Sequence, residues 1–163
     1  MKKITLSIAS LLAITTLNSQ ATDLAIDIGS DAFSIEVGSK TFSQDNEFAV
    51  AMLHADDLHL YSFKGLVTGA LEQNNNLEVA LGGKAYVINF FDENIQGLAL
   101  GGELNYKIPM NEKLELHASM YYAPSPTLTD DLDYLTDLTI TASYKILHNG
   151  AIYINYRNIQ ANL

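Results

Sequence analysis

Long runs in which apolar and polar residues alternate are the feature that most constrains the fold of this chain. Within residues 96–108, leucine, tyrosine and isoleucine take every second position from Leu98 onward apart from Gly102, and glycine, alanine or polar residues lie between them. A helix would mix these two sets on every turn, whereas a strand places them on opposite faces. The same period recurs over residues 77–88, 114–122, 134–146 and 151–158. The pattern predicts an all-β protein.

The first third of the chain alternates less cleanly. Shorter runs cover residues 33–37, 48–52 and 58–68, and residues 24–28 either extend the first of these strands or form a strand of their own. Clusters of Asp, Asn, Pro and Gly separate the runs and are typical of turns. We therefore predict eight antiparallel strands joined by hairpins in an up-and-down order.

The N-terminus has the pattern of a secretory signal peptide. Lys2 and Lys3 precede an uncharged, mostly apolar stretch over residues 4–17, and Ser19 and Ala21 supply the small residues of a cleavage site. We expect cleavage after Ala21, with one domain over residues 22–163. No later stretch reaches the roughly 18 consecutive apolar residues of a transmembrane helix.

Composition restricts the partners of the chain. It has no cysteine, which excludes disulfides and thiolate metal sites. Charged residues make up 17%, against about 25% in soluble domains, and the mean hydropathy is +0.07. Without residues 1–21, seven basic residues remain against nineteen acidic ones. Nucleic acid is therefore excluded as a partner, because phosphate binding needs clustered Lys and Arg.

Strand length favours a membrane protein. Residues 77–88, 96–108 and 134–146 exceed the usual soluble strand of about 5–6 residues and match the about 9–11 residues that cross a bilayer. Eight strands also make the smallest common bacterial barrel. We predict an eight-stranded transmembrane β-barrel in the bacterial outer membrane. Alternation alone equally permits a soluble periplasmic barrel with its apolar face inward around a small apolar ligand.

The polar phase carries charges of both signs, which we predict to face the interior of the barrel as a charge network. An eight-stranded barrel is just wide enough for side chains to fill, and unpaired charges there would be costly. Such an interior suits a structural or interaction role in the envelope better than bulk solute passage. The residues of this network are Glu36, Glu47, Lys64, Glu78, Lys84, Glu103, Lys107, Glu115, Asp137, Lys145 and Arg157.

Tyrosines occur on the apolar phase near several strand ends. Membrane barrels place such rings at the boundary between lipid and water. We expect this interfacial position for Tyr106, Tyr122, Tyr134, Tyr144 and Tyr156.

Four short blocks resemble a known family. They are GGKAY at residues 82–86, GGELNY at residues 101–106 with Pro109 after it, YYAPS at residues 121–125, and the segment from Tyr153 to Arg157. In this order they are similar to the YfaZ family of small Gram-negative outer-membrane proteins, over most of the chain after residue 21. The resemblance implies an outer-membrane barrel with no established catalytic activity, so it assigns no functional residues.

His117 and Ser119 are the candidate catalytic pair. Their spacing places both on one face of a strand, where the histidine could activate the serine and Glu115 or Asp131 could orient the ring. The pair resembles the His-x-Ser of outer-membrane lipid A deacylases, so a barrel-embedded lipid-modifying hydrolase is one alternative function. A structural histidine in a polar interior is the simpler interpretation, and a non-enzymatic protein is our main expectation.

Other polar clusters indicate no cofactor. His54, Asp56, Asp57 and His59 surround one turn and could bind zinc or copper, but ordinary polar turn residues explain them equally well, and we expect no metal. The glycines form no nucleotide-binding loop. Acidic loops are expected to be solvated and could bind divalent cations that bridge to lipopolysaccharide phosphates; they contain Asp92, Glu93, Asp130, Asp131 and Asp133.

Overall fold

The computed structural model describes residues 3–18, 22–29, 31–41, 46–56, 58–71, 74–90, 93–129, 132–147 and 150–162. These residues are all-β apart from one 3-10 turn, η1 (Ser125–Thr127). The described part of the chain holds no helix that is long and apolar enough to cross a membrane. The strands are β1 (Lys3–Asn18), β2 (Thr22–Gly29), β3 (Ala32–Thr41), β4 (Asn46–Ala55), β5 (Leu58–Leu71), β6 (Asn74–Phe90), β7 (Glu93–Lys107), β8 (Leu114–Pro124), β9 (Tyr134–Leu147) and β10 (Gly150–Asn162).

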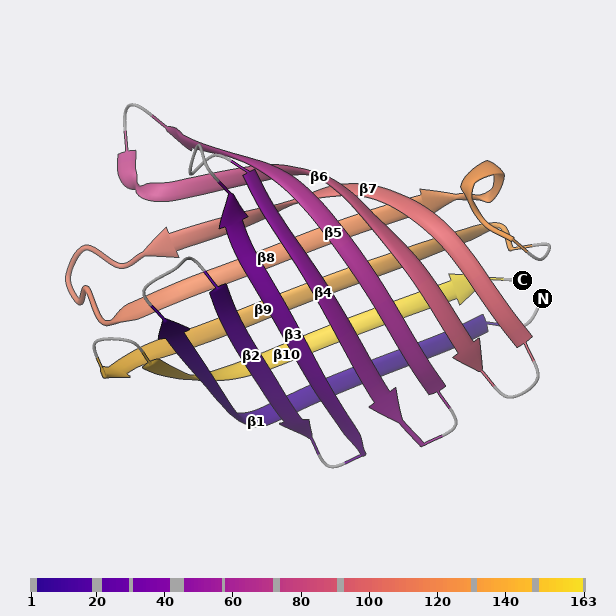
Figure 1. The fold of residues 1–163 in the computed structure, drawn as a ribbon, viewed down its shortest axis with the longest axis horizontal. Helices are drawn as coiled ribbons and strands as arrows, with labels where there is room; N and C mark the ends of the chain where they lie inside the picture. The colour runs from indigo at the N-terminus through magenta and orange to yellow at the C-terminus, as the bar shows by residue number, and fades with distance from the viewer. Residues whose placement is uncertain are drawn as a thin grey trace.

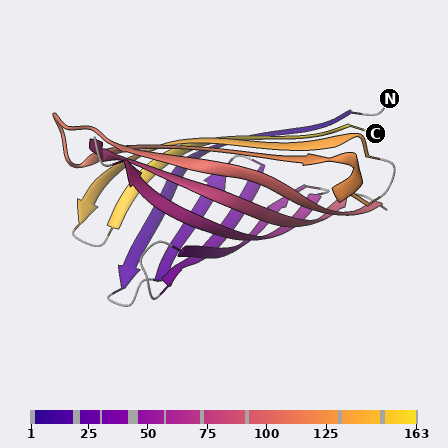
Figure 2. The same cartoon turned by 90° about the horizontal axis from the view of Figure 1, so that it is seen from above.

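The strands form one closed antiparallel barrel. Each strand from β2 to β10 pairs with its neighbour along the chain, and β1 closes the wall by pairing with both β2 and β10. Both ends of the chain lie at the same end of the barrel (Figures 1 and 2). The predicted up-and-down order is therefore present.

The predicted number of eight strands is wrong. Nine described strands follow residue 21, because residues 24–28 belong to a separate strand, β2, instead of extending β3. The chain reverses between Gly29 and Ala32, so that Ile28 pairs with Phe33. A further strand, β1, lies within the segment that the sequence predicts to be a signal peptide.

The two ends of the barrel differ in composition. At the end that carries the β2–β3, β4–β5, β6–β7 and β8–β9 connections, inward side chains form an apolar core, and we call this the closed end. The opposite end, with the β3–β4, β5–β6, β7–β8 and β9–β10 connections, is the open end. The core of the closed end includes Leu53, Leu58, Leu60, Ile88, Ile95, Leu132, Leu135 and Ile159.

The long connection between β8 and β9 folds into the closed end. The Thr129 amide donates a hydrogen bond of 2.8 Å to the carbonyl of Gln96, at the start of β7. Leu128 packs directly on Gly97, where a Cβ atom would lie 2.4 Å from its side chain. Leu132, from the same connection, is 2% exposed. This connection therefore helps to close the barrel at this end.

The outward face of the wall is apolar. Large hydrophobic side chains are exposed on the strands from β2 to β10, and Leu100 is 76% exposed on the outside of β7. Inward positions along the same strands carry the buried charges Lys64, Lys84, Glu103, Asp137 and Arg157. The apolar phase therefore faces out and the polar phase faces in, which is the arrangement expected of a membrane barrel.

Candidate functional site

Asp137 is the centre of one buried ion cluster. Arg157 on the neighbouring strand, β10, donates to both of its carboxylate oxygens, at 2.9 and 2.7 Å. From β6, three strands away around the wall, Lys84 Nζ lies 3.0 Å from Asp137 Oδ2 and the Tyr86 hydroxyl donates to the same oxygen at 2.8 Å. Asp137 is 1% exposed. Two cations thus share one carboxylate, and the cluster carries one net positive charge.

Lys64 is the centre of a second cluster with the opposite balance. Its ammonium group lies 3.0 Å from carboxylate oxygens of Glu36 and Glu103, and 3.5 Å from Glu47. The Tyr121 hydroxyl donates to Glu103 at 2.6 Å. Three carboxylates share one ammonium, so this cluster carries two net negative charges.

Aromatic rings connect the two clusters. Lys84 Nζ lies 5.2 Å from the ring centroid of Tyr86 and 5.1 Å from that of Tyr121, within the range of a cation–π contact. Since Tyr86 also bonds to Asp137 and Tyr121 to Glu103, the clusters form one layer of charge across the lumen. This layer lies next to the apolar core of the closed end.

The remaining residues of the predicted network lie nearer the open end. Lys145 Nζ is 3.4 Å from Glu115, and both side chains are partly exposed. Lys107 is exposed and pairs in register with Glu115, and Glu78 pairs in register with Asn105. The structure thus brings most of the expected charges into a buried layer and leaves these four residues toward the rim.

The structure does not assemble the candidate catalytic pair. His117 Nδ1 lies 2.7 Å from the amide oxygen of Asn105, and its Nε2 lies 3.8 Å from Glu103. In the described part of the chain, the Ser119 hydroxyl has no hydrogen-bond partner, and Glu115 pairs with Lys145. Asp131 lies outside the described residues. A hydrolase needs its base within hydrogen-bond reach of the nucleophile, so this geometry gives that alternative no support.

Four of the five candidate interfacial tyrosines lie toward the strand ends. Tyr122 and Tyr134 stack at the closed end with ring centroids 6.4 Å apart. Tyr106 and Tyr144 lie toward the open end of β7 and β9. Tyr156 is halfway along β10 and pairs with Ile140, so it lies away from both ends.

The histidines at the β4–β5 turn lie on the outward face near the closed end. His54 and His59 pair across the hairpin, with their Nδ1 atoms 3.0 Å apart. The described residues contain no group of three or more side chains that could hold a metal ion. Asp57, and the acidic loop residues Asp92, Asp130 and Asp131, lie outside the described residues.

A polar cavity of about 500 Å³ lies between the charged layer and the open end. Its lining comes from every strand from β2 to β10 and includes Asp23, Asp27 and Glu36. Asp23 and Asp27 were not singled out from the sequence. The signal for them is the alternation in residues 24–28, which places both aspartates on the polar phase of β2.

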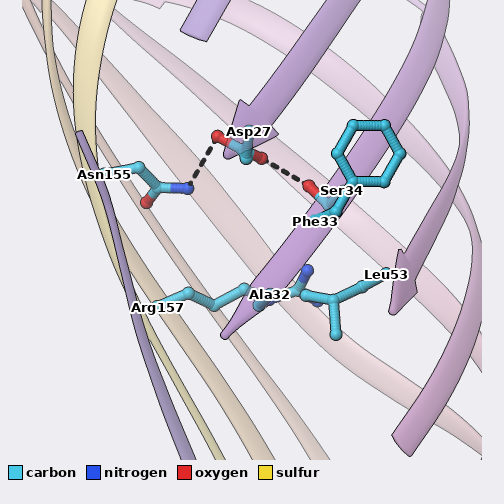
Figure 3. Close-up of a pocket in the computed structure, with 7 residues that line it drawn as sticks. All are labelled: Asp27, Ala32, Phe33, Ser34, Leu53, Asn155 and Arg157. Atoms are coloured by element: carbon cyan, nitrogen blue, oxygen red, sulfur yellow. Dashed lines mark hydrogen bonds between the residues drawn. The ribbon is translucent and has the colours of Figure 1, made fainter. Parts of the chain in front are cut away.

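Asp27, on β2, faces Asn155, on β10, inside the barrel (Figure 3). Its carboxylate accepts hydrogen bonds from the Ser34 hydroxyl at 2.5 Å and from the Asn155 amide at 3.4 Å. The Tyr153 hydroxyl is a third donor. Each of these partners is neutral, and the Arg157 side chain, which lines the same small pocket, is bonded to Asp137.

Two solved structures have a similar fold. A KdgM porin matches with a TM-score of 0.51 and 14% identity, over 98% of this chain and 99% of the porin chain. A KdgM porin in complex with disordered oligogalacturonate matches with a TM-score of 0.51 and 15% identity, over 97% of this chain and 99% of that one. At this identity the likeness concerns the fold alone, and it supports a porin-like barrel.

The sequence comparisons agree with the predicted family. No curated protein matches the sequence. The family model described as "YfaZ precursor" matches residues 1–162, almost the whole chain. The resemblance of the glycine and tyrosine blocks is thereby confirmed, and the chain belongs to the YfaZ family.

Proposed function

We propose that residues 22–163 form a non-enzymatic outer-membrane β-barrel whose lumen is a blind polar pocket. The observation that carries this proposal is that the barrel wall has apolar side chains outside and ion pairs inside, the reverse of the arrangement in a soluble barrel. Monomeric soluble proteins rarely expose apolar patches larger than a few hundred Å². A closed barrel also satisfies its backbone hydrogen bonds without water, which a hydrocarbon environment requires.

The direction of the apolar phase also bears on the soluble alternative. A soluble barrel around an apolar ligand needs apolar residues along its cavity and polar residues outside. The described cavity is instead lined by Asp27, Glu36, Lys64 and other polar groups. This arrangement favours lipid as the surroundings of the outer wall, with lipopolysaccharide next to its rim.

The blocked closed end supports a non-conducting role. The apolar core and the ion-paired layer occupy the closed end, so the cavity has a single mouth. One KdgM porin structure contains oligogalacturonate, a polyanion. The described lining of this lumen has six carboxylates against four lysine and arginine side chains, a balance that disfavours such a ligand here. We therefore propose envelope structure or ligand binding as the role, without bulk passage of solutes.

The signal peptide is part of the same proposal. Export would remove residues 1–21, including β1, and leave nine strands in the mature protein. The match of the family model described as a precursor supports processing of this kind. The cavity-lining residues named above lie in β2–β10, so they stay with the mature chain.

Membrane fractionation of cells that express the full chain tests the proposal. We expect the protein in the outer-membrane fraction, with an intact mass that begins at Thr22 and an electrophoretic mobility that changes on heating. In planar bilayers, the purified protein should produce no stable conductance steps. A freely soluble mature protein would disprove the membrane assignment, and stable channels would disprove the blind lumen.

A further inference from the structure

The lumen cavity has the size and enclosure of a ligand site. In the barrel of the full chain, its volume of about 500 Å³ falls within the range of about 300–1,000 Å³ that is typical of small-molecule pockets. The charged layer forms its floor, and the open end forms its mouth. A small molecule can therefore enter it without passing through the barrel.

Carboxylates exceed the available cations along this lining. Lys84 and Arg157 are both engaged by Asp137 at the floor, and Lys145 is engaged by Glu115 near the rim. Lys64 is then the cation left to offset Glu36, Glu47 and Glu103, as described above. Asp27 has only neutral donors around it, so a surplus of negative charge faces the cavity.

The surplus is concentrated on the wall formed by β2 and β3, at Asp27 and Glu36. Glu36 pairs in register with Ala25, so Asp27 is its diagonal neighbour on the inward face. Diagonal neighbours of this kind lie about 7–8 Å apart. Two carboxylates at this spacing suit a ligand with more than one positive charge along its length.

Ser119 provides an independent indication of a ligand. Its side chain lines the cavity and is 8% exposed, yet within the described residues it has no hydrogen-bond partner. Buried hydroxyls are normally paired. A ligand donor or acceptor in the cavity would satisfy this group, on the wall opposite the β2–β3 carboxylates.

We propose that the cavity binds a small organic polyamine, with its ammonium groups on the Asp27 and Glu36 side and a polar group or bridging water near Ser119. The proposal rests on the blind lumen proposed above. An organic cation suits the cavity better than a metal ion, because the described residues hold no group of three metal ligands and the volume far exceeds that of one ion. The positive charges would offset the surplus that the lining leaves uncompensated.

Calorimetric titration of the purified protein in detergent micelles, with spermidine as the probe, tests this inference. We expect one spermidine bound per barrel, an affinity that falls as salt rises, and no binding of the trianion citrate. Asp27→Asn should weaken spermidine binding at least about tenfold, the equivalent of about 1.4 kcal/mol. Asp56→Asn is the matched control, since Asp56 is exposed at the closed-end turn, and it should bind as the wild type does.

The possible outcomes separate the two proposals. Heat-modifiable protein in the outer membrane that binds no spermidine, or binds citrate equally well, would overturn the inference and leave the barrel intact. Magnesium binding that Asp27→Asn abolishes, without spermidine binding, would also overturn it in favour of a metal site. Protein that is not in the outer membrane would instead disprove the proposed function. Should Asp27→Asn not fold, Ser34→Ala, which removes a donor to Asp27, should still alter spermidine affinity.

Discussion

At the scale of residues, the charged layer depends on Asp137. Replacing this carboxylate by the isosteric amide in Asp137→Asn would leave Lys84 and Arg157 facing each other without a counter-charge. Removing one partner of a buried ion pair costs about 3–5 kcal/mol, and we expect a loss of this size in the free energy of unfolding, measured by denaturant titration in micelles. Glu115→Gln is the control: its partner Lys145 is 43% exposed, so the loss should stay below about 1 kcal/mol. Equal losses in both variants would contradict the buried layer.

Gly101 marks a position where the strands approach most closely. A Cβ atom there would lie 2.0 Å from the carbonyl oxygen of Met120 on β8, a contact that only a shift of the backbone can relieve. We expect Gly101→Ala to lower the free energy of unfolding by about 1–3 kcal/mol, the usual cost of overpacking. A Cβ atom at Gly69 would meet nothing within 4 Å, so Gly69→Ala should unfold at the same denaturant concentration as the wild type. A Gly101→Ala variant with the stability of the wild type would show that β7 and β8 lie further apart at this position than in the structure described above.

At the scale of elements, the β8–β9 connection acts as part of the core. Leu132 belongs to the apolar cluster of the closed end, although it lies in a segment without regular structure. We expect Leu132→Ala to cost about 2–5 kcal/mol, as truncation of a buried leucine does, and to increase cleavage by protease near residues 125–133. Leu147→Ala, at a site that is 69% exposed, should change neither measurement by a comparable amount. A loss for Leu147→Ala equal to that for Leu132→Ala would argue against the packed connection.

At the scale of the whole molecule, removal of β1 would make β2 and β10 neighbours. These two strands run in the same direction, so nine strands can close only through one parallel pair. The pairings of β1 provide the register, since Ser10 lies between Gly29 and Asn155, Ala13 between Asp27 and Tyr153, and Thr16 between Leu24 and Gly150. In each of these three cases the β10 residue follows the β2 residue by the same number of positions in the sequence. Ile28 and Ile154 have this same separation, so they should lie side by side, and both are exposed on the outward face.

A disulfide between cysteines at these two positions tests the nine-stranded closure. The chain has no cysteine of its own, so the double variant Ile28→Cys with Ile154→Cys has a clean background. Adjacent strands place Cα atoms about 5 Å apart, whereas one intervening strand doubles this spacing to roughly 10 Å, beyond the reach of a disulfide. We expect the mature double variant to cross-link on mild oxidation. Ile28→Cys with Leu100→Cys, on a distant strand, should not. Failure of the first pair in folded mature protein would show that this seam does not form.

The sequence by itself determined the class of fold, the family and the residues that share each face of the strands. Period-two alternation is a local property, because successive side chains on any strand point to opposite faces. It therefore placed Lys84 and Asp137 on one phase without any knowledge of the partners of β6 and β9. The run over residues 24–28 is short and lies close to residues 33–37, so alternation alone did not separate the two strands, and the number of strands was wrong for that reason.

Tertiary structure alone decided which side of the sheet became the interior and which charges meet there. The Asp137 carboxylate binds Arg157 from the adjacent strand. It also binds Lys84 from β6, which is 53 positions away along the chain. Likewise, Leu128 and Leu132 close one end only because their connection folds back over Gly97. Such contacts depend on closure of the barrel, which no pattern within a single strand encodes. Alternation specifies the two faces of a sheet, whereas the curvature and pairing of the entire wall specify which face surrounds a polar pocket.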